Sequence, residues 1–314
     1  MTCAGRYQAG RFTARNAHNR NTRASETFIL QSPKCPVSCQ QLREHPPHAN
    51  LPRVKLAVHI LLLASALVLP PQLRAAPFDH SHTNFSQVLS RIVKDDLVDY
   101  STLKTDQISL ERYLDQLAQV PEPVFTKFSE KQKIAFLINL YNASTLQLIV
   151  RHYPIKSTKE IGSWLTGPFD QKTVRFMGRS LSLGDIEHHV LRRNHDEPRF
   201  HFAIVSAAIG FPPLRHEAYQ DAKLDEQMDD QIRRFLRQPS KNRIDLSGRM
   251  LHLSRIFKWY EKDLNRKAGS LTQFVVNYLD TDIAETIRGS RFEITYTDFD
   301  WLLNDSASTA ALKR

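Results

Sequence analysis

The sequence predicts an α+β fold, with one central buried helix, several further helices and a small, mainly antiparallel sheet built from hairpins. Residues 129–152 form a long stretch that is apolar nearly all round, as in a helix at the centre of a domain. Residues 173–182 and 244–253 each place a glycine-containing turn between two strand-like runs, which predicts two hairpins. Helices outnumber strands, which argues against a doubly wound parallel sheet.

Capping residues and apolar spacing locate the helices. The central helix should begin after Ser129, whose hydroxyl can cap it while Gln132 reaches back, and should end near His152. Ser182 and Asp185 are expected to cap a helix that follows the first hairpin. The remaining helices are expected over residues 85–93, 110–117, 224–235, 255–264 and 271–279.

Two further apolar segments are expected to be strands. Residues 200–206 form an apolar run that ends abruptly in Gly210-Phe211-Pro212-Pro213, and residues 292–296 alternate like a late strand. In a regular strand neighbouring side chains point to opposite faces, so His201 and Ser206 would face away from each other.

The charge of the chain is concentrated at its N-terminus. The formal net charge is +10, but residues 1–76 carry ten Lys/Arg and only two Asp/Glu, so the remainder is nearly neutral. A nucleic-acid-binding domain needs a basic patch on its folded surface. We therefore expect no nucleic-acid partner.

Residues 51–76 are predicted to be a secretory signal. Basic residues precede the apolar core Leu56–Leu69, and a small residue, Ala75, stands at the expected cleavage site. The core is short for a membrane span, although an uncleaved anchor is the alternative. The mature protein is expected to be periplasmic or secreted and to meet the membrane only during export.

The signal divides the chain into parts. Residues 1–50 are expected to be a disordered or mis-assigned extension, 77–304 a single domain, and 305–314 a C-terminal tail. Cys3, Cys35 and Cys39 all precede the cleavage site, so the mature chain should carry no thiol and no disulfide. The sequence does not predict an oligomeric state.

Several short motifs occur together in a fixed order. They are Phe136–Ala143, Ser182–His188, His201–Val205, Pro212–Arg215, Leu253–Tyr260, and Tyr296 through Trp301–Asn304. With these motifs the chain resembles the DUF547 family over about residues 85–304. That family has no settled biochemical role, so the resemblance implies an identity rather than an activity.

The chain departs from the family pattern at two positions. The family commonly has cysteines where this chain has Ser206 and Phe211. Their joint loss implies that the two cysteines acted as a pair, through a disulfide or a metal, or that a thiol nucleophile has been abandoned.

The leading functional hypothesis is a cleft that binds a small polar or peptide-like ligand. Arg215 has the geometry to hold a carboxylate or phosphate, unless it pairs with Glu217 or Asp221. The residues expected to line this cleft are Asn139, Asn142, Glu187, His201 and Arg215.

The alternatives are a hydrolase in the style of the thiol peptidases and a non-catalytic structural envelope protein. In the hydrolase, Ser206 would be the nucleophile and His188 its base, although no Gly-x-Ser-x-Gly motif surrounds Ser206. Glu187 and His188 suggest metal chemistry, but the chain has no His-Glu-x-x-His motif. No metal or cofactor is therefore predicted.

Overall fold

The computed structural model describes residues 77–162 and 166–307, all of which lie in one compact unit, Arg74–Arg314. The predicted extension, the predicted signal and the three cysteines lie outside the described residues.

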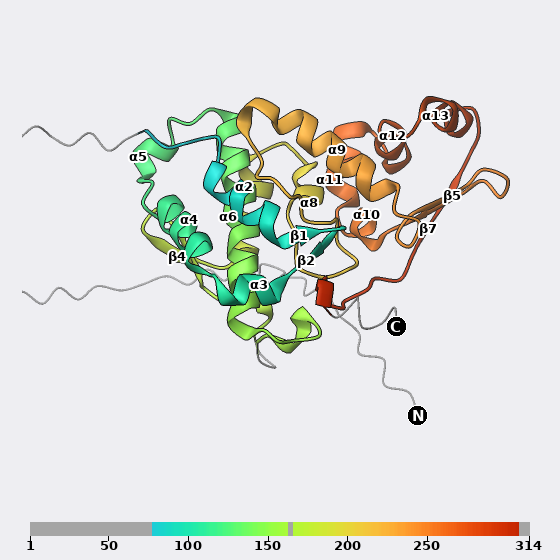
Figure 1. Cartoon of the computed structure of the whole chain (residues 1–314). Coiled ribbons are helices and arrows are strands. Elements are labelled where there is room, and N and C mark those ends of the chain that lie inside the picture. The colour runs from blue at the N-terminus through green and yellow to red at the C-terminus, as the bar shows by residue number, and fades with distance from the viewer. Residues whose placement is uncertain (1–76, 163–165, 308–314) are drawn as a thin grey trace, which may run out of the picture. The chain divides into compact units, whose positions relative to one another are not determined.

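The central helix is α6, Glu130–His152, which all the other elements of the first hydrophobic cluster surround (Figure 1). Ser129 and Gln132 form the predicted capping box, in which Ser129 Oγ accepts from the Gln132 amide at 3.2 Å and Gln132 Oε1 accepts from the Ser129 amide at 2.9 Å. The length and composition of α6 would suit a membrane span, but 89% of its most apolar 18-residue segment is buried inside the protein. This is the pattern of a core helix.

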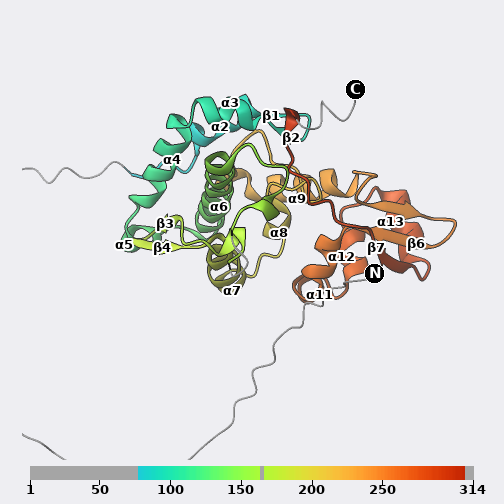
Figure 2. The same ribbon diagram turned by 90° about the horizontal axis from the view of Figure 1, so that it is seen from below.

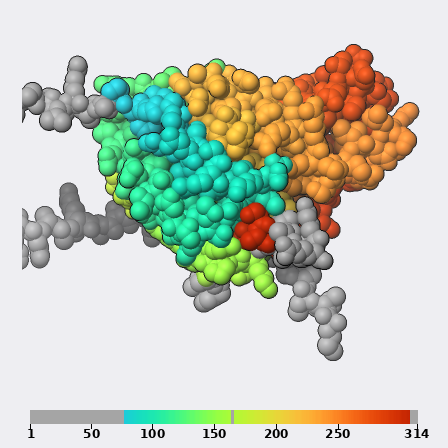
Figure 3. Space-filling view, in the orientation of Figure 1, coloured from blue at the N-terminus to red at the C-terminus, as the bar shows by residue number. Residues whose placement is uncertain are grey.

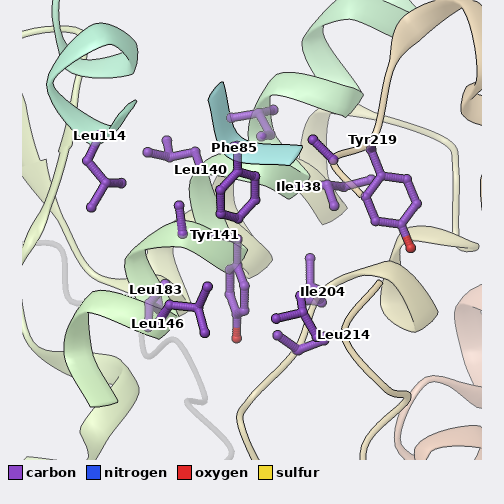
Figure 4. Close-up of a cluster of buried hydrophobic side chains, with 14 of the residues drawn as sticks. Phe85, Leu114, Ile138, Leu140, Tyr141, Leu146, Leu183, Ile204, Leu214 and Tyr219 are labelled. Carbon is purple, nitrogen blue, oxygen red and sulfur yellow. The ribbon is translucent and has the colours of Figure 1, made fainter. Parts of the chain in front are cut away.

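Four helices before α6 cover one side of it (Figures 1 and 2). They are α2 (Thr83–Ile92), α3 (Tyr100–Thr105), α4 (Ile108–Ala118) and α5 (Glu122–Phe125). The short antiparallel strands β1 (Val93–Lys94) and β2 (Leu97–Val98) join α2 to α3. Figure 4 shows how Phe85 of α2 and Leu140 and Tyr141 of α6 meet in the core. Burying such large apolar side chains supplies most of the stabilisation.

The first predicted hairpin is confirmed. Strands β3 (Val174–Phe176) and β4 (Arg179–Leu181) pair antiparallel around Met177 and Gly178, both of which have positive φ. Glycine adopts this conformation without strain, which explains the turn at this place.

The helix after this hairpin is a π-helix, η3 (Asp185–Leu191), continued by α7 (Arg192–Asn194). Ser182 and Asp185 cap it reciprocally, with the Asp185 amide donating to Ser182 Oγ at 3.0 Å and the Ser182 amide to Asp185 Oδ2 at 2.8 Å. The capping residues were predicted from sequence, but the wide π-turn was not. Such turns are rare and often occur at functional sites.

The strand predicted over residues 200–206 is wrong. Phe200–Ala203 form a short helix, α8, and the chain then continues without regular structure to a single bridge between Ala208 and Leu303. A short apolar run is equally typical of a buried helix and of a buried strand, so its periodicity could not decide. Because residues 200–206 do not form a strand, the prediction that His201 and Ser206 point to opposite faces of one no longer applies.

A second hydrophobic cluster is built from the C-terminal half of the unit. After η4 (Asp221–Lys223), helix α9 (Leu224–Leu236) has the predicted apolar stripe, all of it buried. The helix expected over 255–264 is broken at Tyr260 into α10 (Arg255–Trp259) and α11 (Glu261–Ala268). Helices α12 (Leu271–Val276) and α13 (Thr281–Arg288) follow.

The three-stranded sheet combines the second predicted hairpin with the predicted late strand. Strands β5 (Arg243–Asp245) and β6 (Met250–Leu253) pair antiparallel, and β7 (Glu293–Tyr296) adds to β6 in parallel. The sheet is therefore mixed, since α10 to α13 form the crossover that a parallel partner requires.

The segment at residues 302–305 ties distant parts of the unit together. Its bridges connect Leu302 to Ser157, Leu303 to Ala208 and Asp305 to Val98. On the face shown in Figure 3, the N-terminal helices lie beside α9, and Asp96 accepts hydrogen bonds from Arg234 at 2.5 Å and Gln238 at 2.9 Å. Two short helices, η1 (Thr158–Glu160) and η2 (Pro168–Asp170), complete the described elements.

Candidate functional site

Asn139 and Asn142 of α6 hold backbone segments rather than line a cleft. The Asn139 amide group donates to the Tyr219 carbonyl at 2.7 Å and its oxygen accepts from the Tyr219 amide at 3.0 Å. Asn142 bonds in the same way to the Ala203 carbonyl and the Val205 amide, both at 3.0 Å. Both side chains are buried, and buried backbone groups need hydrogen-bond partners. Asn139 and Asn142 supply these partners to the backbone at Tyr219, Ala203 and Val205, which do not pair with a strand.

Arg215 is also committed to partners within the protein. Its guanidinium donates to Asp230 Oδ2 at 2.5 Å and to Glu217 Oε1 at 3.0 Å. The ion pair with Glu217 was the alternative expected from sequence, whereas Asp230 replaces the expected Asp221. The predicted common cleft of five polar residues is not assembled in this structure.

Glu187 and His201 do meet, through Tyr260. The Tyr260 hydroxyl donates to Glu187 Oε1 at 2.6 Å, and its ring stacks on the His201 ring with centroids 3.6 Å apart and planes 14° apart. Burial raises the pKa of Tyr260 well above its usual range, so the hydroxyl keeps its proton and remains a donor. The Tyr141 hydroxyl reaches the second carboxylate oxygen of Glu187 at 3.5 Å.

His201 is fully buried and is held by Asp263. Its Nε2 lies 3.0 Å from Asp263 Oδ2, which also accepts from Arg192 Nε at 2.7 Å. The hydrogen bond from His201, followed by that from Arg192, lowers the pKa of Asp263 to about 2. Burial lowers the pKa of His201, so the neutral ring donates its Nε2 proton to the carboxylate. Its Nδ1 is then an acceptor that has no hydrogen-bond partner among residues 77–162 and 166–307.

The structure does not assemble the predicted pair of Ser206 and His188. The Ser206 hydroxyl is buried and has no hydrogen-bond partner among the described residues. The His188 ring is about half exposed and its Nδ1 lies 3.8 Å from Glu187 Oε1. A nucleophile needs a base within hydrogen-bond reach, and this geometry supplies none.

Sequence reasoning missed four members of the cluster around His201, namely Tyr141, Arg192, Tyr260 and Asp263. Tyr260 is also a buried residue of the second hydrophobic cluster. Asp263 has no local sequence signal, because its burial and its partners are apparent only in the folded protein. Helix α11 faces α8 only in the folded protein, so the pairing with His201 is a tertiary feature.

A groove of about 790 Å³ lies beside η3. Apolar side chains of α5, the β3–β4 hairpin and η3 contribute to its lining, namely Phe125, Phe176, Met177, Leu181 and Val190. Its charged and polar lining comprises Thr126, Glu130, Lys133, Lys172, Arg179, Asp185, His189, Asn194 and His195. None of these residues was predicted as a site from sequence.

Both acids of this groove are paired, whereas two of its cations are not. Glu130 lies 2.6 Å from His195 Nδ1, and Asp185 pairs with Lys172. Lys133 and Arg179 form no ion pair with any described residue. The groove therefore offers uncompensated positive charge above an apolar lining.

Among residues 77–162 and 166–307, no group of three or more His, Cys, Asp or Glu side chains is arranged to hold a metal ion. The cluster around His201 contributes one histidine and two separate carboxylates, each already hydrogen-bonded to protein groups.

Part of the chain matches a known family. Residues 125–236 match the model of the family described as "Protein of unknown function, DUF547". The match is narrower than the expected resemblance over 85–304, but it contains every residue that lines the groove and also Glu187, His201 and Arg215. No curated protein and no solved structure matches the chain.

Proposed function

We propose that residues 125–236, which match the model of the DUF547 family of proteins of unknown function, form a binding module for small peptide-like ligands with a free carboxylate. The ligand occupies the groove beside η3, and its carboxylate pairs with Lys133 and Arg179.

The composition of the groove supports this class of ligand. Binding sites for small molecules are concave, largely apolar and supplied with a few polar groups that fix orientation. Phe125 and Phe176 are buried core residues that reach the groove, and they offer apolar surface to a ligand side chain. The volume of about 790 Å³ falls within the range of roughly 300–1,000 Å³ that such sites have.

The distribution of charge supports an anionic group on the ligand, and it is the observation that carries the proposal. Lys133 and Arg179 are the groove cations without an ion-pair partner among the described residues. An arginine can bind a carboxylate with two parallel hydrogen bonds, and a lysine adds a point charge. The paired acids, Glu130 and Asp185, remain as acceptors for the backbone amides of a peptide.

We further propose that the domain acts outside the cytoplasm, in the periplasm or after secretion. The support is the predicted signal over residues 51–76 and its expected cleavage near Ala75. Mass spectrometry of the protein purified from its native host should find a mature N-terminus near residue 76. A peptide that contains Cys3 in that protein would contradict export with cleavage.

Ligand binding is tested on the full chain with two tripeptide libraries, one with free C-termini and one with C-terminal amides. Thermal shift and NMR chemical-shift changes should identify free-carboxylate peptides as ligands, and amidation should weaken binding about tenfold because one ion pair is lost. The double variant Lys133→Gln/Arg179→Gln should weaken binding of the free peptides by a similar factor.

Lys262→Gln is the matched control, since Lys262 is an exposed cation of α11 that does not line the groove. It should leave binding unchanged. Equal binding of amidated and free peptides, or equal losses in the groove and control variants, would rule out the proposed carboxylate site. An absence of binding by either library would reject the peptide-binding function.

A further inference from the structure

A second hollow, of about 280 Å³, lies between three segments that are far apart in the chain. Its walls come from the turn at Asp96 and Leu97, from residues 208–209 and 211–213, from residues 237–241 and from Asn304. None of its residues lines the peptide groove. The two hollows are therefore separate sites.

Lys241 is one of the residues that line this cavity. Its Nζ donates to the carbonyl of Phe211, another wall residue, at 2.7 Å, and lies 5.5 Å from the centre of the Phe235 ring. No carboxylate among the described residues forms an ion pair with Lys241, so a neutral carbonyl is its hydrogen-bond acceptor. A lysine without a salt bridge in a partly apolar cavity is unusual, since buried lysines are normally paired.

The carboxylates around Lys241 do not bring its pKa back to the usual value for a lysine. Burial lowers the pKa of Lys241 to about 8, although Asp96 and Asp300 act in the opposite direction. Asp96 is already engaged by Arg234 at 2.5 Å. Arg237, which also lines the cavity, is paired with Asp280 at 2.9 Å at the surface. At pH 7 about one tenth of the Lys241 amines are thus uncharged.

We propose that Lys241 is a reactive amine that captures a small, uncharged aldehyde in this cavity as a Schiff base. The cavity, at about 280 Å³, is larger than a cavity of about 150 Å³ that holds benzene, so a small aldehyde fits in it. Ile209 and Pro212 offer apolar walls, whereas Ser240 and Asn304 offer polar groups to a hydroxyl. The one other cation of the cavity, Arg237, already has its carboxylate, so a keto acid finds no free counter-ion there.

The reaction needs no further co-reactant. The lone pair of neutral Lys241 Nζ attacks the aldehyde carbon, a carbon–nitrogen bond forms, and the carbonyl oxygen takes a proton to give a carbinolamine. The hydroxyl group then leaves as water after it is protonated, and a carbon–nitrogen double bond remains. One water molecule is released for each aldehyde that is bound, and hydrolysis reverses the step. Desolvated lysines form such adducts because the amine is the reactive species.

The test is reductive trapping of the folded full-length protein with glyceraldehyde and cyanoborohydride, followed by site-resolved mass spectrometry. At pH 7, Lys241 should be modified at least about tenfold faster than the exposed Lys262, because more of its amine is uncharged. Its rate should rise with pH to a midpoint near 8.

Lys241→Arg should remove this fast adduct and leave labelling of the other lysines unchanged, and Lys262→Arg should leave it intact. The wild-type rates decide the proposal even if Lys241→Arg folds poorly. Labelling of Lys241 that is no faster than that of Lys262, or that appears only in urea, would overturn it. Lys133→Gln/Arg179→Gln should not change the Lys241 rate, which separates this site from the peptide groove.

Discussion

His201 of α8 and Asp263 of α11 form a buried hydrogen bond of 3.0 Å between Nε2 and Oδ2. The two residues are 62 positions apart and link the segment after α7 to the C-terminal cluster. Asp263 also accepts from Arg192, so one carboxylate holds three elements together. The pair makes the stability of the fold dependent on pH.

Asp263→Asn should reduce the acid sensitivity of the protein. The pKa of Asp263 is lowered from 3.8 to about 2 in the folded state, so its contribution is present above about pH 4 and is lost as the pH falls towards 2. The shift corresponds to about 2 kcal/mol. Urea unfolding at a series of pH values should show that the wild type loses about 2 kcal/mol more than the variant over this range.

The same substitution should cost about 2 kcal/mol at pH 7, because Arg192 and His201 lose their charged acceptor. Glu285→Gln on the exposed face of α13 is the matched control and should change neither quantity. If the free energy of unfolding fell equally steeply between pH 4 and pH 2 for the wild type and for Asp263→Asn, the assigned role of the carboxylate would be contradicted.

His201 should remain neutral in the folded protein at pH values where an unfolded histidine is already charged. Burial lowers its pKa below 6.5, so the unfolded chain binds more protons and stability falls as the pH drops below about 6.5. Nitrogen-15 NMR of the imidazole should show a protonated Nε2 and an unprotonated Nδ1 at pH 6.5. A doubly protonated ring at that pH would mean that Asp263 holds an imidazolium instead.

Asn142→Ala should destabilise the fold by about 2–4 kcal/mol. The substitution leaves the Ala203 carbonyl and the Val205 amide buried without partners, at about 1–3 kcal/mol each. Asn277→Ala is the control, since Asn277 is exposed and its oxygen accepts only from the neighbouring Gln273. Chemical denaturation measures the stability of both variants. Similar small losses of stability would show that the hydrogen bonds of Asn142 to Ala203 and Val205 are dispensable.

Ser206→Ala should leave stability unchanged or raise it by about 1 kcal/mol. The hydroxyl is buried without a hydrogen-bond partner, so its removal relieves a desolvation cost. Peptide binding by the groove should not change. A loss of more than about 1 kcal/mol, or a loss of any hydrolytic activity found in the wild type, would restore Ser206 as a structural or catalytic residue.

Much of the secondary structure was predictable because its signals are local. The capping box at Ser129, the turn at Met177 and Gly178 and the apolar stripe of α9 each depend on residues a few positions apart. The run at 200–206 was the exception, since four to seven buried apolar residues fit either a helix or a strand. The parallel pairing of β7 with β6 also could not be predicted from neighbouring residues, because it depends on how α10 to α13 place β7 beside β6.

The fold class, the central helix and the resemblance to a family could all be read from the sequence, and residues 125–236 match that family's model. Tertiary structure decided which polar residues meet. It engaged Asn139, Asn142 and Arg215 with partners inside the protein and brought His201 to Asp263. It also left Lys133, Arg179 and Lys241 beside hollows, without an ion pair to any residue that the structure describes. The physical reason is that capping and periodicity act over one helical turn, whereas burial and hydrogen-bond satisfaction depend on which distant segment packs alongside.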